Sequence, residues 1–253
     1  MKNNVVRQIT LSALILALTI ICTRVFSIQN IPIVPFVRIS IGPALIIFAS
    51  IFLGPISGLI VGAASDILGI VLFPNALGYS INPLFTVVYG LLGLCPFFIF
   101  KGAKMLKKNS INFGIISAIL GSLCIFTTIF MLLNNSIVLF GKTYEFLAWH
   151  KTLIISLSWV LSIASVLAIY FIDKHLKKKY GEDIADVYPI AVACVLSELF
   201  VMLILNSIVK VMFFEVDFLF VFFSQAVVFF IDLPLNTFVV SLLGVLYKKV
   251  VLK

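Results

Sequence analysis

The stretch RISIGPALIIFASIFLGPISGLIVGAASDILG, residues 38–69, largely determines the fold class of this chain. It holds two apolar runs that are separated only by Gly54-Pro55, and no charge interrupts them before Asp66. Gly accepts turn conformations and Pro suits the first turn of a helix, so the pair ends one helix and begins the next. These residues therefore predict two antiparallel helices in a membrane.

The composition of the whole chain agrees with this prediction. Of its 253 residues 62% are hydrophobic and only 11% are charged, whereas soluble domains have about 45–50% and about 25%. A soluble fold could not bury so much apolar surface. We therefore expect an all-α, polytopic membrane helix bundle that forms a single membrane domain over residues 1–253.

Further apolar runs follow along the chain. A helix needs about 20 apolar residues to cross about 30 Å of hydrocarbon. About eight transmembrane helices are predicted, at residues 9–26, 39–53, 56–73, 83–100, 111–134, 152–172, 187–213 and 217–247.

The lysines and arginines predict the orientation of these helices, because cytoplasmic loops are enriched in basic residues. If both termini are cytoplasmic, 13 of the 18 basic residues lie inside: Lys2, Arg7, Lys101, Lys104, Lys107, Lys108, Lys174, Lys177, Lys178, Lys179, Lys248, Lys249 and Lys253. The net charge of +8 then reflects membrane insertion and does not indicate nucleic-acid binding.

A short internal repeat indicates a duplicated helical hairpin. Residues 131–138 match residues 202–209 at six of eight positions, and the same offset aligns Lys177-Lys178 with Lys248-Lys249. Both hairpins are expected to turn on the outer side after an Asn-Ser pair. The hairpin at 111–174 is interpreted as the insertion.

Catalytic and metal-binding patterns are not found in the sequence. The four cysteines lie in separate apolar runs, the two histidines have no second ligand at metal spacing, and no HExxH or GxSxG motif occurs. We therefore expect no enzyme, no cofactor and no metal. Any uphill transport would take its energy from a partner.

A few charged residues lie at membrane depth, where each costs about 2.5–3.5 kcal/mol near the centre of a span. They are Asp66, Glu198 and Asp232, with Arg24, Arg38 and Lys210 near outer helix ends. Structural pairing accounts for the acidic residues, and snorkelling of long side chains to the headgroups accounts for the arginines. Ligand contact is the alternative.

The outer loops favour that alternative for Arg24 and Arg38. The loop at 27–37 is rich in Pro, and the loop at 73–83 is rich in Asn and aromatic residues; irregular backbone at this depth is tolerated where it lines a cavity. An apolar slot with a few directing polar groups is predicted. Its candidate substrate-binding residues are Arg24, Phe36, Arg38, Asp66, Asn75, Tyr79, Asn82 and Phe85.

The cytoplasmic half of the first span carries Ala13 and Ala17, four residues apart on one helix face. Small residues at this spacing let a second helix approach closely. This face is predicted to dock a partner, with packing inside the bundle as the alternative.

Taken together, these residues resemble the substrate-binding S components of energy-coupling factor (ECF) vitamin transporters, in particular the folate/pantothenate-type branch. The resemblance rests on Arg38 to Pro43, on Phe52 to Gly58, on Gly62 to Gly69, and on Leu72-Phe73-Pro74 with Gly78-Tyr79 and Phe85-Thr86. Ala13xxxAla17 looks like the family's docking motif. The resemblance covers residues 9–100 well and 187–247 loosely.

The resemblance implies a subunit of the bacterial plasma membrane that binds a vitamin from outside, most readily folate, with pantothenate as the nearest rival. It implies as partners a T component, on which the subunit topples, and two ATPase subunits. It also implies six helices, formed by residues 9–100 and 187–247, so the hairpin at 111–174 is extra. A membrane-embedded lipid-modifying enzyme and a stand-alone secondary transporter that uses Asp66 or Asp232 as a proton relay remain as rival functions.

Overall fold

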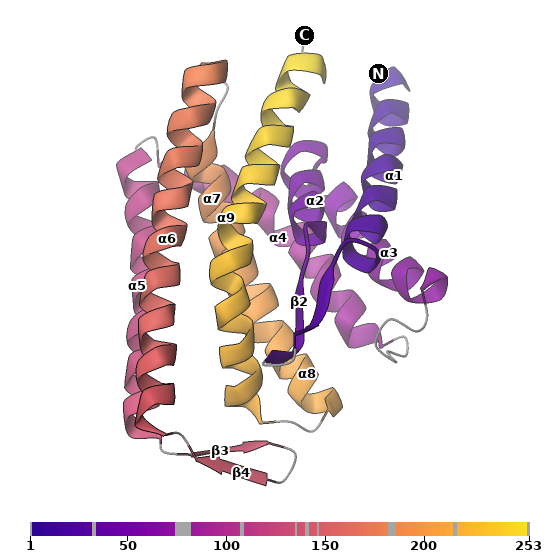
Figure 1. Ribbon diagram of the computed structural model, residues 1–253. Coiled ribbons are helices and arrows are strands. Elements are labelled where there is room, and N and C mark those ends of the chain that lie inside the picture. Colours follow the sequence, from indigo (N-terminus) through magenta and orange to yellow (C-terminus); the bar gives the residue numbers. More distant parts are fainter. Residues whose placement is uncertain are drawn as a thin grey trace.

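The apolar runs form helices in the computed structural model (Figure 1), which describes residues 2–31, 34–73, 82–106, 109–134, 136–139, 142–145, 147–181, 186–214 and 217–251. Two of the helices change from α- to π-helical geometry along their length. The helices are α1 (Lys2–Arg24), α2 (Gly42–Phe48) continuing into η1 (Ala49–Leu53), α3 (Pro55–Leu72), α4 (Pro83–Met105), α5 (Asn109–Leu133), α6 (Ala148–Tyr180), α7 (Val187–Ser197) continuing through η2 (Glu198–Leu205) into α8 (Asn206–Phe214), and α9 (Phe218–Val251).

The prediction of a polytopic helical membrane protein is confirmed. Seven of these helices are long and apolar enough to cross a membrane, and Gly42–Leu53 is a shorter apolar helix. The N- and C-terminal ends lie at the same end of the bundle (Figure 1), as an even number of crossings requires. The turn predicted at Gly54 is present, and its φ of 106° lies in the region that glycine tolerates best.

The first outer connection differs from the irregular loop that the sequence predicts. It forms an antiparallel hairpin of β1 (Ile28–Ile31) and β2 (Val34–Ile39), in which Gln29 pairs with Arg38. Isoleucine, valine and phenylalanine are enriched here, and such residues favour strands. A second hairpin, β3 (Ser136–Leu139) and β4 (Lys142–Glu145), lies between α5 and α6.

The repeated segment adopts two different conformations, although the second copy still ends its helix close to the predicted residue 213. In the first copy the helix ends at Leu133, and β3 begins at Ser136. In the second copy Asn206 and Ser207 are buried inside a helix that continues to Phe214. The reason is that the residues after Ser207 continue an apolar run long enough for two more helical turns.

Helices α3 and α4 form a close pair that depends on small residues. A Cβ added to Gly58 would overlap the carbonyl oxygen of Gly93, and one added to Gly62 would overlap the carbonyl oxygen of Tyr89. Such contact between backbones replaces the hydrophobic driving force that helices lack in lipid.

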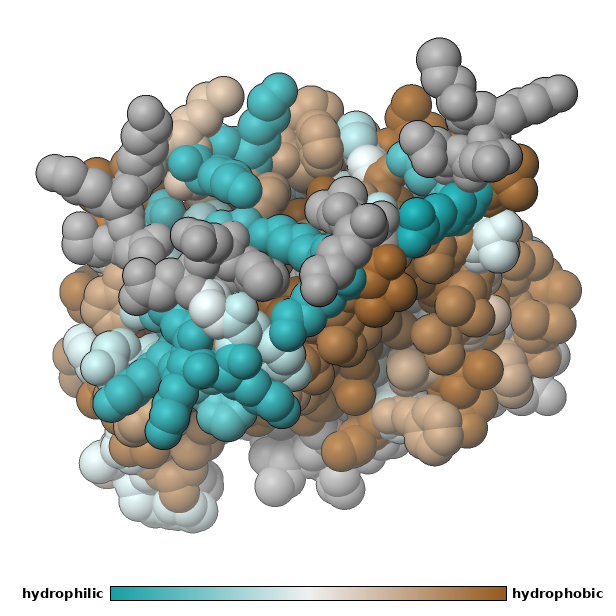
Figure 2. All heavy atoms as spheres, turned by 90° about the horizontal axis from the view of Figure 1, so that it is seen from above, coloured by the Kyte–Doolittle hydropathy of each residue, from teal (hydrophilic) through white to brown (hydrophobic). Residues whose placement is uncertain are grey.

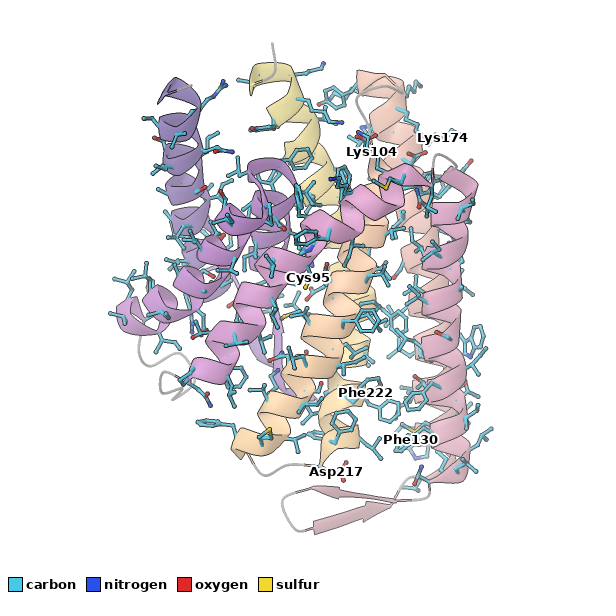
Figure 3. All side chains as sticks on the ribbon, turned by 180° about the vertical axis from the view of Figure 1, so that it is seen from behind. Cys95, Lys104, Phe130, Lys174, Asp217 and Phe222 are labelled. Atoms are coloured by element: carbon cyan, nitrogen blue, oxygen red, sulfur yellow. The ribbon has the colours of Figure 1, made fainter. Side chains whose placement is uncertain are left out.

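The last two membrane helices pack against the first four. α7 packs on α4, and α9 packs on α2 and on β2. α5 and α6 pair with each other at one side of the bundle (Figure 1) and contact α7 and α9. Figure 3 shows Phe130 of α5 and Phe222 of α9 on facing helices, and the Phe130 and Phe223 ring centroids are 4.2 Å apart.

Charges gather at the end that carries both termini, where Figure 2 shows hydrophilic side chains and Figure 3 labels Lys104 and Lys174. Asp186, just before α7, accepts hydrogen bonds from Lys104 at 3.1 Å and from Lys248 at 2.7 Å. Burial by itself would raise the pKa of Asp186, but these two lysines outweigh it and hold the pKa below its ordinary value. The lysines mark this end as cytoplasmic.

We predict that Gly62→Ala destabilises the protein, because its methyl group would overlap the carbonyl of Tyr89. Overpacking of this kind costs about 1–3 kcal/mol, which corresponds to a fall of about 2–12 °C in the midpoint of thermal unfolding in detergent. The control is Gly114→Ala in α5, where an added Cβ meets nothing within 4 Å. An equal fall in both variants would contradict the close α3–α4 contact.

Candidate ligand site at the outer end

The candidate ligand site lies at the end of the bundle opposite the termini. Here α1 and α3 end, α4 begins, and α8 approaches its C-terminal end, with the hairpin β1–β2 alongside α9. Residues of four helices and one hairpin therefore contribute to the region in which the sequence predicts a slot.

A buried ion pair joins three of these helices. The Nη2 atom of Arg24, the last residue of α1, lies 3.8 Å from Oδ1 of Asp66 in α3, and the two side chains are only 7% and 6% exposed. Oδ2 of Asp66 accepts a hydrogen bond from the hydroxyl of Thr86 in α4 at 2.9 Å. Asp66 thus connects α1 to α4, and each of its oxygens has a partner.

Local packing explains why Arg24 reaches Asp66. Gly69 follows Asp66 by three residues on α3. A Cβ added to Gly69 would lie 2.7 Å from Nε of Arg24, so only glycine leaves room for the guanidinium over α3. On α1 the hydroxyl of Thr23 donates to the carbonyl of Thr19 at 2.8 Å. Thr23 in turn lies against Gly42 at the start of α2.

Aromatic and polar side chains complete the described part of this end. The rings of Phe85 in α4 and Phe213 in α8 meet edge to face, with centroids 6.2 Å apart. Lys210 and Asn206 on α8 are both buried. These residues form an apolar wall with a few polar groups, which is the composition of many small-molecule sites.

The predicted residues are described to different extents. Asn82 is the N-cap of α4, where its side-chain oxygen accepts from the backbone N–H of Leu84 at 2.9 Å. Phe36 and Arg38 lie on β2, and their side chains fall outside the described part of the structure, as do Asn75 and Tyr79 altogether. For these five residues ligand contact remains a prediction.

The structure brings together Arg24, Asp66 and Phe85 at this end, but it gives Arg24 a partner other than a ligand. Asp66 balances the charge of Arg24, and ligand contact by Arg24 or Asp66 remains a prediction. Phe213 was not found from the sequence, and Gly69 and Thr86 entered only as parts of the family resemblance, without a role of their own. Each of the three acquires its role from a residue on another helix.

In the described ranges no three His, Cys, Asp or Glu side chains gather in a way that could hold a metal ion. A cavity of about 430 Å³ lies elsewhere, near the cytoplasmic end, and is lined by Ile51, Phe97, Phe100, Lys101, Lys104 and Met105. At the outer end the described residues combine the edge-to-face pair of Phe85 and Phe213 with the ion pair of Arg24 and Asp66.

The fold defines a polytopic membrane protein whose basic end carries both termini. The model of a protein family described as "ECF-type riboflavin transporter, S component" matches residues 3–178, more than two thirds of the chain. The chain belongs to this family. No curated protein and no solved structure is similar enough to match it.

The family assignment confirms the main functional prediction and corrects its detail. The protein is an S component of an ECF transporter, a multi-pass protein of the cell membrane that binds a vitamin for transport and is not an enzyme. At the level of the family, its partners are a T component and ATPase subunits. The expected folate/pantothenate branch is not supported, because the family that matches is the riboflavin type.

We predict that Arg24 and Asp66 are energetically coupled. Arg24→Gln or Asp66→Asn alone leaves an uncompensated buried charge and should cost about 3–5 kcal/mol. The double variant should cost clearly less than the sum, which thermal unfolding in detergent would measure as a double-mutant cycle.

The control is Lys104→Gln, which removes one partner of a pair whose lysine is 57% exposed. That change should cost at most about 1 kcal/mol. Strictly additive effects of the two substitutions on the free energy of unfolding would show that the side chains of Arg24 and Asp66 do not stabilise each other.

Proposed function

We propose that this S component binds riboflavin, an uncharged vitamin with a flat heteroaromatic ring system, at the outer end of the bundle. The observation that carries the proposal is the buried pairing of Arg24 with Asp66. Folate and pantothenate carry carboxylates, which a cation without an acidic partner binds best, and the cation of α1 is already neutralised by Asp66. The name of the matching family points the same way.

The aromatic residues suit such a ligand. A flat ring system gains dispersion and stacking energy between aromatic side chains, and Phe85 with Phe213 supplies one described wall. We propose that Phe36 and Tyr79 add apolar surface and that Asn75, Asn82 and Arg38 donate hydrogen bonds to polar edges of the ring. Arg24 and Asp66 then act as positioning residues that hold α1, α3 and α4 around the ligand.

The binding test uses the purified chain in detergent. Riboflavin is titrated by the quenching of its own fluorescence, and folate and pantothenate are titrated by calorimetry. We expect saturable binding of riboflavin and much weaker binding of the other two. Tight binding of folate or pantothenate, without binding of riboflavin, would refute the substrate proposal.

The role of Arg38 is tested by Arg38→Ala. Loss of a hydrogen bond from a charged donor costs roughly 1.5–3 kcal/mol, so the affinity for riboflavin should fall about 10–100-fold. Lys142→Ala on β4 is the matched control, because it also removes a cation from an outer hairpin. If both variants bind as the unchanged protein does, Arg38 lies outside the pocket.

We propose that Ala13 and Ala17 dock the T component. Both residues are exposed, whereas Ile15 and Thr19 on the other face of α1 are buried in the bundle. The alanine face is thus left open by the packing of the described residues, and its small side chains would admit a partner helix closely.

For this docking face we predict that Ala13→Trp or Ala17→Trp abolishes vitamin uptake by the assembled transporter and leaves riboflavin binding unchanged. The bulky ring would hold a partner helix away without reaching the outer end. Ala164→Trp, at an exposed position on α6, is the control and should preserve uptake. Loss of binding together with uptake would place the alanine face inside the bundle.

We further propose that residues 111–174 are a peripheral addition and that 187–247 complete the binding unit, although the family match includes the former and ends before the latter. The packing of α7 on α4 and of α9 on α2 supports this assignment. Deletion of 111–174 should give a less stable protein that still binds riboflavin, and deletion of 187–247 should abolish binding. If deletion of 111–174 abolished binding and deletion of 187–247 did not, residues 111–174 would complete the binding unit and residues 187–247 would be the addition.

A further inference from the structure

A second group of polar side chains lies deep in the membrane, between η2 and α9. Glu198 is the first residue of η2 and is 2% exposed. The Nδ2 atom of Asn236 donates a hydrogen bond of 2.7 Å to its Oε1 atom. Asp232 precedes Asn236 by one turn of α9 and therefore shares its face. The face of α9 that carries Asp232 and Asn236 therefore contacts Glu198 through Asn236.

Several oxygens in this region are buried and lack a hydrogen-bond partner among the described residues. They include Oδ1 of Asp232, Oδ1 of Asn236 and the hydroxyl of Thr237. Asn236 and Thr237 are fully buried, at 0% exposure. The hydrogen bond from Nδ2 of Asn236 to Glu198 fixes the orientation of the amide, and Oδ1 of the same amide is left without a donor among the described residues. Each such buried group costs about 1–3 kcal/mol if nothing satisfies it.

The charges of the cluster are also not balanced by the protein. Within the part of the chain that the structure describes, neither Glu198 nor Asp232 forms an ion pair with a basic side chain. Two neighbouring carboxylates in a medium of low dielectric constant require a compensating positive charge. The unpaired oxygens of Asp232 and Asn236 are acceptors, and the hydroxyl of Thr237 can also accept, so all three have lone pairs with which to ligate a cation.

Both helices depart from regular geometry here. Glu198 begins a π-helical segment, and Pro234 lies between Asp232 and Asn236 in α9. Pro234 cannot donate to the carbonyl of Phe230, which instead accepts from the hydroxyl of Ser165 in α6 at 2.6 Å. π-helical turns and interrupted membrane helices recur at ion and ligand sites.

We propose that Glu198, Asp232 and Asn236 form a binding site for a hard, oxygen-seeking metal cation of the Na⁺ or Ca²⁺ kind. The donors are carboxylate and amide oxygens, with the hydroxyl of Thr237 nearby, and such ligands select hard cations over zinc or copper. The expectation of no metal rested on the spacing of Cys and His, and it did not consider carboxylate and amide oxygens from facing helices. The site does not depend on the identity of the vitamin.

The cation would hold η2 against α9 and thereby stabilise the folded protein by mass action. The test follows the thermal unfolding of the purified full chain in detergent, at constant ionic strength, as choline chloride is replaced by NaCl, KCl, CaCl₂ or MgCl₂. We expect a saturable rise of the midpoint with Na⁺ or Ca²⁺, on the order of 5–10 °C at a hundredfold excess over Kd.

Glu198→Gln and Asp232→Asn should abolish the rise, because each is isosteric but removes one negative charge. Asp217→Asn is the matched control, since Asp217 caps α9 outside the cluster through backbone N–H groups that Asn can also cap. The Asp217→Asn variant should show the same salt-dependent rise of the unfolding midpoint as the unchanged protein. Asn236→Asp adds a carboxylate and should increase the affinity for Ca²⁺, which tests the site even if the other variants do not fold.

A midpoint that depends on pH but shows no saturable response to any of the four metal ions would mean that protons alone neutralise the pair, and it would overturn the proposal. An equal response to all four salts that survives both charge-removing variants would also overturn it, because the effect would then arise elsewhere on the protein.

Discussion

Hydrocarbon offers no hydrogen bonds, so every polar group that enters the membrane has to find its partner within the protein. Two prolines inside helices show how this requirement shapes the bundle. Pro96 interrupts α4, where the backbone N–H of Phe97 donates to the hydroxyl of Ser50 at 3.2 Å. Pro234 interrupts α9, where Ser165 satisfies the carbonyl of Phe230. Each irregular turn is thus supported by a neighbouring helix, and the helices are fixed relative to one another.

The same requirement separates two kinds of buried charge. Arg24 and Asp66 neutralise each other and join α1, α3 and α4 at the outer end. The pair itself carries no net charge, and Lys210 on α8 is a further buried cation at this end. Glu198 and Asp232 are both acidic and have no basic partner among the described residues, so their neutralisation has to come from protons or from a bound cation. The distinction follows from the pairing and not from the burial of either residue alone.

The two faces of α1 differ in burial. The face with Ile15 and Thr19 is buried in the bundle, and it leads to Thr23 and Arg24 at the outer end. The face with Ala13 and Ala17 remains exposed. One rigid helix therefore connects the ligand end to the surface proposed for the T component.

Composition and charge distribution alone determined the membrane location, the helical class, the orientation and most helix positions, because insertion depends on the local apolar length and on flanking lysines. The sequence also pointed to Arg24, Asp66, Phe85 and the alanine pair. Only the tertiary structure decided that Arg24 is paired with Asp66, that residues 28–39 form a hairpin, and that the two Asn-Ser copies differ. Those features depend on contacts such as Arg24 over Gly69 or Asn236 with Glu198, which join residues far apart in the chain. A pattern along the sequence records which residues prefer the membrane, whereas the partner of a charge inside it depends on which helices pack together.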